Sequence, residues 1–210
     1  MVDLKNLYDA ILAGNLKLAV ETTQEAIVEN KDPQEVINQY MVKAMEEIGA
    51  RFEAGKAFVP NLLMSARAMK GSLDLLKPIM ENTAAKPMGK VVIGTVKGDL
   101  HDIGKNLVAS MLEGCGFEVV NLGVDVPSER FVNAIQENKP DLLCMSALLT
   151  TTMNYMKEVV EAVQKAGLRQ QVKIMVGGAP VNDMFALQIG ADGYSANANA
   201  AVALARNLIA

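Results

Sequence analysis

Histidine and cysteine, the usual protein ligands of transition metals, are scarce in this sequence, which has one histidine and two cysteines among 210 residues. Cys115 and Cys144 are far apart and do not form a C-x-x-C pair, so neither a disulfide framework nor a thiolate zinc site is expected. Both are expected to be small buried hydrophobes. His101 alone cannot complete a metal site made only of protein ligands. Any bound metal must therefore bring most of its own ligands, as a metal inside a macrocycle does.

Basic charge, aromatic side chains and long apolar runs are also lacking. The net charge is −4, the pI is about 5.1, and there is no tryptophan. Such a chain has no general attraction to nucleic acid or anionic membranes, and few rings for base stacking. No apolar run reaches the roughly eighteen residues of a membrane span, and the start lacks a signal-peptide pattern. We therefore expect a cytoplasmic protein with neither a nucleic acid nor a membrane as partner.

The hydrophobic periodicity changes near residue 90 and predicts two domains. Over residues 3–80, apolar positions recur at spacings of three and four, which predicts helices. Helix start and stop signals divide this stretch into four helices, at Gly14-Asn15, Asp32-Pro33, Gly55 and Val59-Pro60. We expect a four-helix bundle over 1–80, a linker over 81–89 and a second domain over 90–210.

From residue 90 onward, short β-branched runs alternate with amphipathic segments. Strands are expected at 90–96, 117–122, 141–146, 172–177 and 191–195, and helices at 104–114, 128–138, 153–166, 180–189 and 197–208. Five such repeats predict an α/β domain, a doubly wound parallel sheet with helices on both faces. The flavodoxin-like, Rossmann-like order 2-1-3-4-5 suits this length and places a ligand crevice at the carboxyl ends of the first and third strands.

Three sequence features fall on the same edge of the predicted sheet, and the first two flank the crevice. The first strand leads into the run Gly98–Asn106, in which His101 stands two residues after Asp99. An imidazole beside a carboxylate suits a metal ligand whose second nitrogen is oriented by an acid. Hydroxyl side chains follow the third strand within 146–152, and Gly177-Gly178 ends the fourth, where the backbone can approach a bulky ligand closely.

Each feature also has a plain structural interpretation. His101 could be a solvated loop residue, Asp99 could cap the following helix, and the hydroxyls could cap the next one. Lys105 and Asn106 could be exposed residues of a first helical turn. Nucleotide binding lacks its fingerprints, because neither G-x-G-x-x-G nor G-x-x-x-x-G-K-[ST] is present, and no nucleophile elbow supports acyl transfer.

The ordered set Asp99-x-His101-x-x-Gly104, Ser146-x-Leu148 and Gly177-Gly178 resembles the signature of cobalamin-binding domains of the methionine synthase type. Residues 3–80 resemble the helical module that precedes such domains. The whole chain is similar to the free-standing corrinoid proteins of anaerobic methyltransferase systems, which serve methanol, methylamines or methoxylated aromatics.

The resemblance implies a role for each matching residue. His101 replaces the cofactor's benzimidazole below cobalt, Asp99 binds its other nitrogen, and Thr152 stands where methionine synthase has the serine of an Asp-His-Ser relay. The implied cofactor-binding set is Asp99, His101, Asp102, Ile103, Gly104, Ser146, Leu148, Thr150, Gly177 and Gly178. The helical module covers the upper face of the corrin, with Phe58, Leu62, Leu63 and Met69 as candidate cap residues.

The implied function is a methyl carrier without turnover of its own. Its cobamide cycles between Co(I) and methyl-Co(III), taking methyl from a substrate-specific methyltransferase and passing it to a second one that serves tetrahydrofolate or a thiol. A reductive activator of the corrinoid is an implied third partner, and the bundle is expected to swing aside about 81–89 during turnover. The alternatives are the cobalamin subunit of a carbon-skeleton mutase, which needs no helical cap, and a cobalamin-dependent sensor, which needs an output module.

Overall fold

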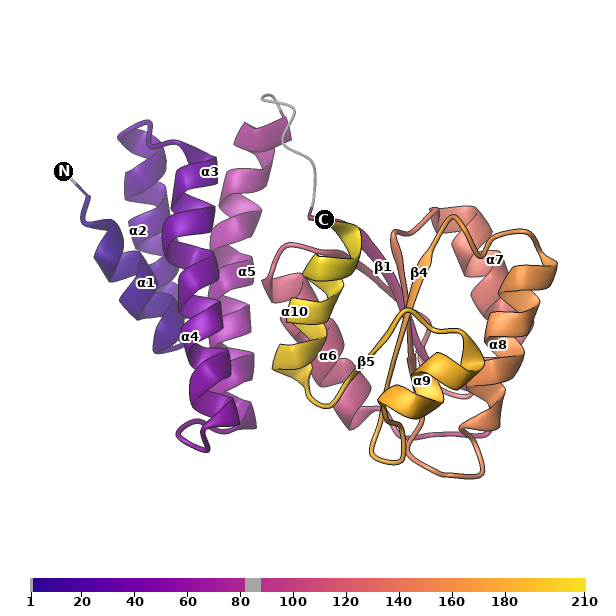
Figure 1. Cartoon of the computed structure of the whole chain (residues 1–210). Coiled ribbons are helices and arrows are strands. Elements are labelled where there is room, and N and C mark those ends of the chain that lie inside the picture. The colour runs from indigo at the N-terminus through magenta and orange to yellow at the C-terminus, as the bar shows by residue number, and fades with distance from the viewer. Residues whose placement is uncertain (1, 82–87) are drawn as a thin grey trace. The chain divides into compact units, whose positions relative to one another are not determined.

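The computed structural model describes residues 2–81 and 88–210, which divide into two compact units (Figure 1). The first contains the N-terminal helices and the stretch Ser110–Gly116, and the second contains the remaining residues from Met88 to Ala210. Residues 82–87 of the expected linker, and the hinge assigned to them, lie outside the described residues. No helix among the described residues is both long and apolar enough to cross a membrane.

The N-terminal unit contains the four helical stretches that its sequence predicts. They are α1 (Leu4–Leu12), α2 (Leu16–Val28), a continuous run of α3 (Pro33–Val36), η1 (Ile37–Met41) and α4 (Val42–Glu53), and α5 (Val59–Glu81). The side chains of Asp3, Asn15 and Asp32 accept hydrogen bonds from backbone N–H groups at the helix starts, as N-caps do. The π-helical turn η1 has no counterpart in the sequence pattern.

The second unit is a five-stranded parallel sheet with the order β2-β1-β3-β4-β5, which confirms the predicted fold. The strands are β1 (Lys90–Thr95), β2 (Glu118–Asn121), β3 (Leu142–Ser146), β4 (Lys173–Gly177) and β5 (Gly193–Ser195). The helices are α6 (Ile103–Gly114), α7 (Ser128–Asn138), α8 (Asn154–Lys165), α9 (Asp183–Ile189) and α10 (Ala198–Ile209). Helices α7, α8 and α9 contribute to one core against the sheet, and α6 and α10 cover the other face (Figure 1).

Burial explains why the central strands read as continuous apolar runs. In β1 every residue from Val91 to Thr95 is buried, and β3 is buried from Leu142 to Met145, because helices cover both faces. Strand order makes β1 and β3 neighbours, so the loops that follow them leave the same edge of the sheet side by side. These two loops, 96–102 and 147–153, carry the residues that the sequence singles out.

Candidate functional site

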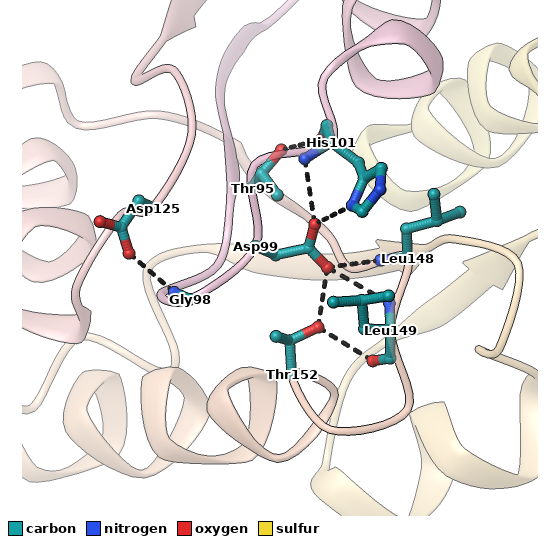
Figure 2. Close-up of polar contacts among 8 residues, drawn as sticks. All are labelled: Thr95, Gly98, Asp99, His101, Asp125, Leu148, Leu149 and Thr152. Atoms are coloured by element: carbon teal, nitrogen blue, oxygen red, sulfur yellow. Dashed lines mark hydrogen bonds and ion pairs between the residues drawn. The ribbon is translucent and has the colours of Figure 1, made fainter.

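Asp99 is the centre of the polar network at this edge of the sheet. Its side chain is fully buried and accepts five hydrogen bonds (Figure 2). One oxygen, Oδ1, accepts from the backbone N–H of His101 at 3.1 Å and faces the His101 ring nitrogen Nδ1 at 2.7 Å. The other, Oδ2, accepts from the N–H groups of Leu148 and Leu149 and from the Thr152 hydroxyl, at 2.7, 3.3 and 2.7 Å. A helix cap is therefore not the role of Asp99, because none of its donors belongs to α6: two come from His101 and three from the loop after β3.

These donors keep Asp99 ionised although it is buried. Burial by itself raises the pKa of a carboxyl group. The hydrogen bonds from the Leu148 N–H, the Thr152 hydroxyl, and the N–H and ring of His101 outweigh burial and hold the pKa of Asp99 well below its usual value. At neutral pH the carboxylate is therefore a fixed negative charge that only accepts hydrogen bonds.

The Asp99 carboxylate determines which nitrogen of His101 can bind a ligand. An ionised carboxylate requires the proton of the imidazole to lie on Nδ1, so the lone pair is on Nε2. Nε2 makes no hydrogen bond within residues 2–81 and 88–210, and the side chain is 50% exposed. The hydroxyl of Thr95 donates to the carbonyl of His101 at 3.0 Å and holds the backbone of the loop. His101 thus presents an oriented nitrogen ligand to the outside of the fold.

Thr152 extends the chain of contacts on the far side of Asp99. It is buried, and its hydroxyl lies 2.7 Å from Oδ2 of Asp99 and 2.9 Å from the carbonyl of Leu149. The structure therefore brings together His101, Asp99 and Thr152 in that order, although the first and last belong to different loops. A threonine hydroxyl reaches the position at which the resemblance expected a serine.

The other residues predicted to bind cofactor lie around this network. Ser146 is half-buried at the end of β3, whereas Asp102, Leu148 and Thr150 are exposed in the two loops and Ile103 is exposed at the start of α6. Of the predicted glycines, Gly177 ends β4, Gly178 directly follows it, and Gly104 lies in the first turn of α6.

The glycines differ in what a side chain would meet. Gly178 has φ +133°, and a Cβ atom there would lie 1.8 Å from the carbonyl oxygen of Ala147, so the fold itself requires glycine. At Gly104 an added Cβ meets no described atom within 4 Å. The absence of a side chain at Gly104 therefore leaves open space beside the His101 loop.

Exposed apolar side chains lie in the two loops and at the start of α6, a feature that periodicity does not reveal. Leu100 and Ile103 are 71% and 84% exposed, and Leu148 and Leu149 are each 42% exposed. Exposed apolar side chains in the same segments as an oriented nitrogen ligand suit a broad, largely apolar macrocycle that carries its own metal. No three His, Cys, Asp or Glu side chains gather around one point in the described part of the chain, so the metal's other ligands must come from the macrocycle. The residues present fit a corrin.

The alternative interpretation of Lys105 as an exposed residue of a first helical turn is wrong. Lys105 is only 3% exposed because its ammonium group turns toward the end of β2, where it donates to Asn106 and, at 2.8 Å, to Asn121. Burial lowers the pKa of Lys105, and the nearby charge of Asp102 opposes that shift. Asn106 in turn donates to Asp102 at 2.9 Å. This cluster ties the start of α6 to the end of β2, beside the His101 loop.

Two family models match the chain, each described as a B12 binding domain. One covers residues 89–203, which include the whole site, and the other covers residues 3–77. The chain belongs to the B12-binding family. Its cofactor is a cobamide.

Similar proteins and solved structures align along nearly the whole of this chain. Trimethylamine corrinoid protein 1 of Methanosarcina acetivorans is 44% identical over 203 residues, 96% of this chain and 94% of the relative. A cobalamin-binding protein from Desulfitobacterium hafniense has a TM-score of 0.85 and 32% identity, covering 100% of both chains. The methanol:cobalamin methyltransferase complex MtaBC of Methanosarcina barkeri has a TM-score of 0.81 and 36% identity, covering 98% of this chain and 79% of that one.

Two of the four expected cap residues, Leu62 and Met69, are fully buried in the structure. Phe58 and Leu63 are exposed, at 69% and 40%, and Met64 beside them is 51% exposed. The sequence periodicity of α5 distinguishes apolar from polar positions but does not show which apolar positions remain exposed.

Proposed function

We propose that this protein carries a methyl group on the cobalt of a cobamide whose lower ligand is Nε2 of His101. The observation that carries the proposal is the buried Asp99 carboxylate, which fixes the proton on Nδ1 and leaves Nε2 directed out of the fold beside exposed apolar side chains. The names of the corrinoid relatives and of the methyltransferase complex support the methyl-carrier role.

The protein residues hold and orient, and the cofactor supplies the reactivity. When bound, the cobamide contributes a cobalt ion that accepts a methyl group in a reduced state and donates it from an oxidised one. Asp99 keeps the imidazole in one tautomer and in one orientation. Thr152 and the N–H of Leu148 stabilise the carboxylate, which keeps a negative charge next to the imidazole.

The proposed partners are two methyltransferases and an activator. A substrate-specific methyltransferase would deliver the methyl group, and a second would transfer it to tetrahydrofolate or a thiol. Among donors, methylamines are favoured because similar chains are named trimethylamine and dimethylamine corrinoid proteins, with methanol and methoxylated aromatics as alternatives. We propose a reductive activator that returns oxidised cobalt to its methyl-accepting state.

The ligand proposal can be tested on one atom, because His101 is the only histidine. In the Co(II) state a single axial nitrogen-14 splits the electron paramagnetic resonance lines into triplets. We expect protein labelled with nitrogen-15 histidine and loaded with unlabelled cobamide to show doublets, and His101→Ala to show no splitting from protein nitrogen. Triplets that persist after labelling would mean that the cofactor's own base remains bound, and would end the proposal.

A second test addresses the carrier role. Reduced, cobamide-loaded protein mixed with a methylamine and its methyltransferase should change its visible spectrum to that of the methylated cofactor. The His101→Ala variant serves as control, since it should accept methyl more slowly. No spectral change with any methylamine, methanol or methoxylated aromatic system would favour a sensor.

The exposed apolar side chains at the start of α5 give a further expected result. We propose that Phe58, Leu63 and Met64 help to shield the cobalt of the bound cobamide. Phe58→Ser should then increase the rate at which azide binds cobalt(III) by roughly threefold to tenfold, since less apolar surface would shield the metal. The control is Val28→Ser, which removes another exposed apolar side chain, from α2. Equal azide rates in wild type and Phe58→Ser would contradict the assignment.

A further inference from the structure

Asp125 has a backbone conformation that residues other than glycine rarely adopt. It lies in the segment between β2 and α7, is exposed, and has φ +54°, in the left-handed region. A residue other than glycine persists there only where surrounding contacts fix it. In this chain, those contacts reach the loop that carries His101.

Asp125 forms hydrogen bonds with that loop at two points. Its carboxylate Oδ1 accepts from the N–H of Gly98 at 2.7 Å (Figure 2). Its own N–H donates to the carbonyl of Asp99 at 3.0 Å. The N–H of Asp99 donates to the carbonyl of Val96 within the turn. Gly98 itself has φ +78°, so the turn depends on these contacts to hold its shape. The positive φ of Asp125 allows its carboxylate and its N–H to form hydrogen bonds with the same turn.

This arrangement is more than a local turn motif. The side-chain bond joins residues 27 positions apart, from the segment after β2 to the loop after β1. The Asp99 side chain is fixed from the other direction by donors of the β3–α8 loop. Asp125 therefore fixes the backbone of the residue whose carboxylate orients His101, while those donors fix the carboxylate.

We propose that Asp125 is a positioning residue of the cobamide site, which acts through Gly98 and Asp99 on the orientation of the His101 ring. The inference rests on the proposed role of His101 as lower ligand. It predicts that loss of the Asp125 carboxylate weakens binding of His101 to cobalt without displacing the cofactor itself.

Three substitutions separate the acceptor from the backbone strain. Asp125→Ala removes the acceptor and keeps a side chain at positive φ. Asp125→Gly removes the acceptor and relieves the strain. Asp125→Asn keeps the Oδ1 acceptor and a residue type that tolerates this conformation. Each full-length variant would be loaded with cobamide in protein labelled with nitrogen-15 histidine.

The measured quantity is the ratio of His-on to His-off Co(II) at fixed pH, read from the fraction of the Co(II) signal that carries the doublet splitting. We expect Asp125→Ala and Asp125→Gly to lower this ratio by about threefold to tenfold, less than the roughly 10- to 100-fold loss that follows removal of a group bonded directly to a metal ligand, because Asp125 acts through Asp99. Asp125→Asn should match wild type. A wild-type ratio in both the Ala and Gly variants overturns the inference, as does restoration in Gly alone or failure of Asn to restore the ratio.

Asp141→Ala provides a matched structural control. The Asp141 carboxylate accepts from the N–H of Lys90 at 2.7 Å, the same kind of long-range bond, but at the amino ends of β1 and β3. Its loss should lower the melting temperature about as much as Asp125→Ala does, and leave the His-on ratio unchanged. If Asp141→Ala lowers the ratio equally, the effect is general destabilisation and the inference fails. A wild-type protein without the doublet refutes the proposed function instead, so the two failures are distinguishable.

Discussion

Replacing Asp99 with asparagine is expected to lower the free energy of unfolding of the cofactor-free protein by about 2 to 4 kcal/mol. The carboxylate accepts all five hydrogen bonds through two oxygens. Asparagine has one oxygen, so its NH₂ group would face either the donors from His101 or those from Leu148 and Thr152. Buried donors would then lose their acceptor, which costs more than the bonds contribute. Urea unfolding followed by circular dichroism would measure the difference.

The same pair of proteins should differ in pH dependence. The pKa of Asp99 is lowered in the folded protein, so the folded state favours the ionised form and the unfolded chain binds the proton more readily. The stability that Asp99 contributes is therefore complete above its unfolded pKa of about 3.9, and is lost as pH falls below it toward the folded value. We expect a constant gap between wild type and Asp99→Asn above about pH 5, narrowing below pH 4.

An exposed aspartate provides the reference for both measurements. Asp183→Asn, in the first turn of α9, should change stability by less than about 0.5 kcal/mol. If Asp99→Asn costs no more than this, the five contacts do not stabilise the fold.

Gly178→Ala is expected to destabilise the sheet unit by about 3 kcal/mol or more, or to prevent its folding. A Cβ atom would lie 1.8 Å from the carbonyl oxygen of Ala147, and the φ of +133° is one that L residues rarely adopt. A backbone oxygen cannot move aside as a flexible side chain can, so β4 or the loop after β3 must shift. Thermal unfolding of the cofactor-free protein would measure the loss.

Gly104→Ala is the matched comparison, since both residues belong to the glycine signature. Its Cβ meets no described atom within 4 Å and it lies in a helix, so alanine should leave the cofactor-free protein equally stable or stabilise it by about 0.5 to 1 kcal/mol. If the space beside Gly104 holds the cofactor's nucleotide tail, the same variant should bind cobamide more weakly. Equal destabilisation by both substitutions would contradict the expectation that the fold requires glycine at position 178 but not at position 104.

Secondary structure and strand order follow closely from the sequence, for a physical reason. Strands buried on both faces are apolar throughout, and the capped helices between them are amphipathic. The two patterns differ, so each segment of residues 90–210 could be predicted as a strand or a helix. The π-helical turn Ile37–Met41 escaped prediction, because one extra residue in a turn leaves the apolar spacing of a helix almost unchanged.

The sequence predicted those parts of the site that follow from short spacings and from the strand order. Asp99 and His101 are two residues apart, and the strand order brings Thr152 beside them from the next loop. The sequence did not show that Lys105 is buried, because its burial depends on an amide acceptor at the end of β2, which no spacing rule links to it. Asp125 was not identified at all, because a single aspartate after a strand carries no chemical pattern; only its φ and its two partners mark it.

The donors to Asp99 also bear on when the site is completed during synthesis. The Leu148 N–H and the Thr152 hydroxyl lie 49 and 53 residues beyond the carboxylate that they satisfy. A nascent polypeptide that stops before Leu148 leaves Oδ2 of this acid without those donors, while Oδ1 can already accept from His101. The environment that keeps Asp99 buried and ionised is therefore complete only after the third strand and the loop that follows it have been synthesised.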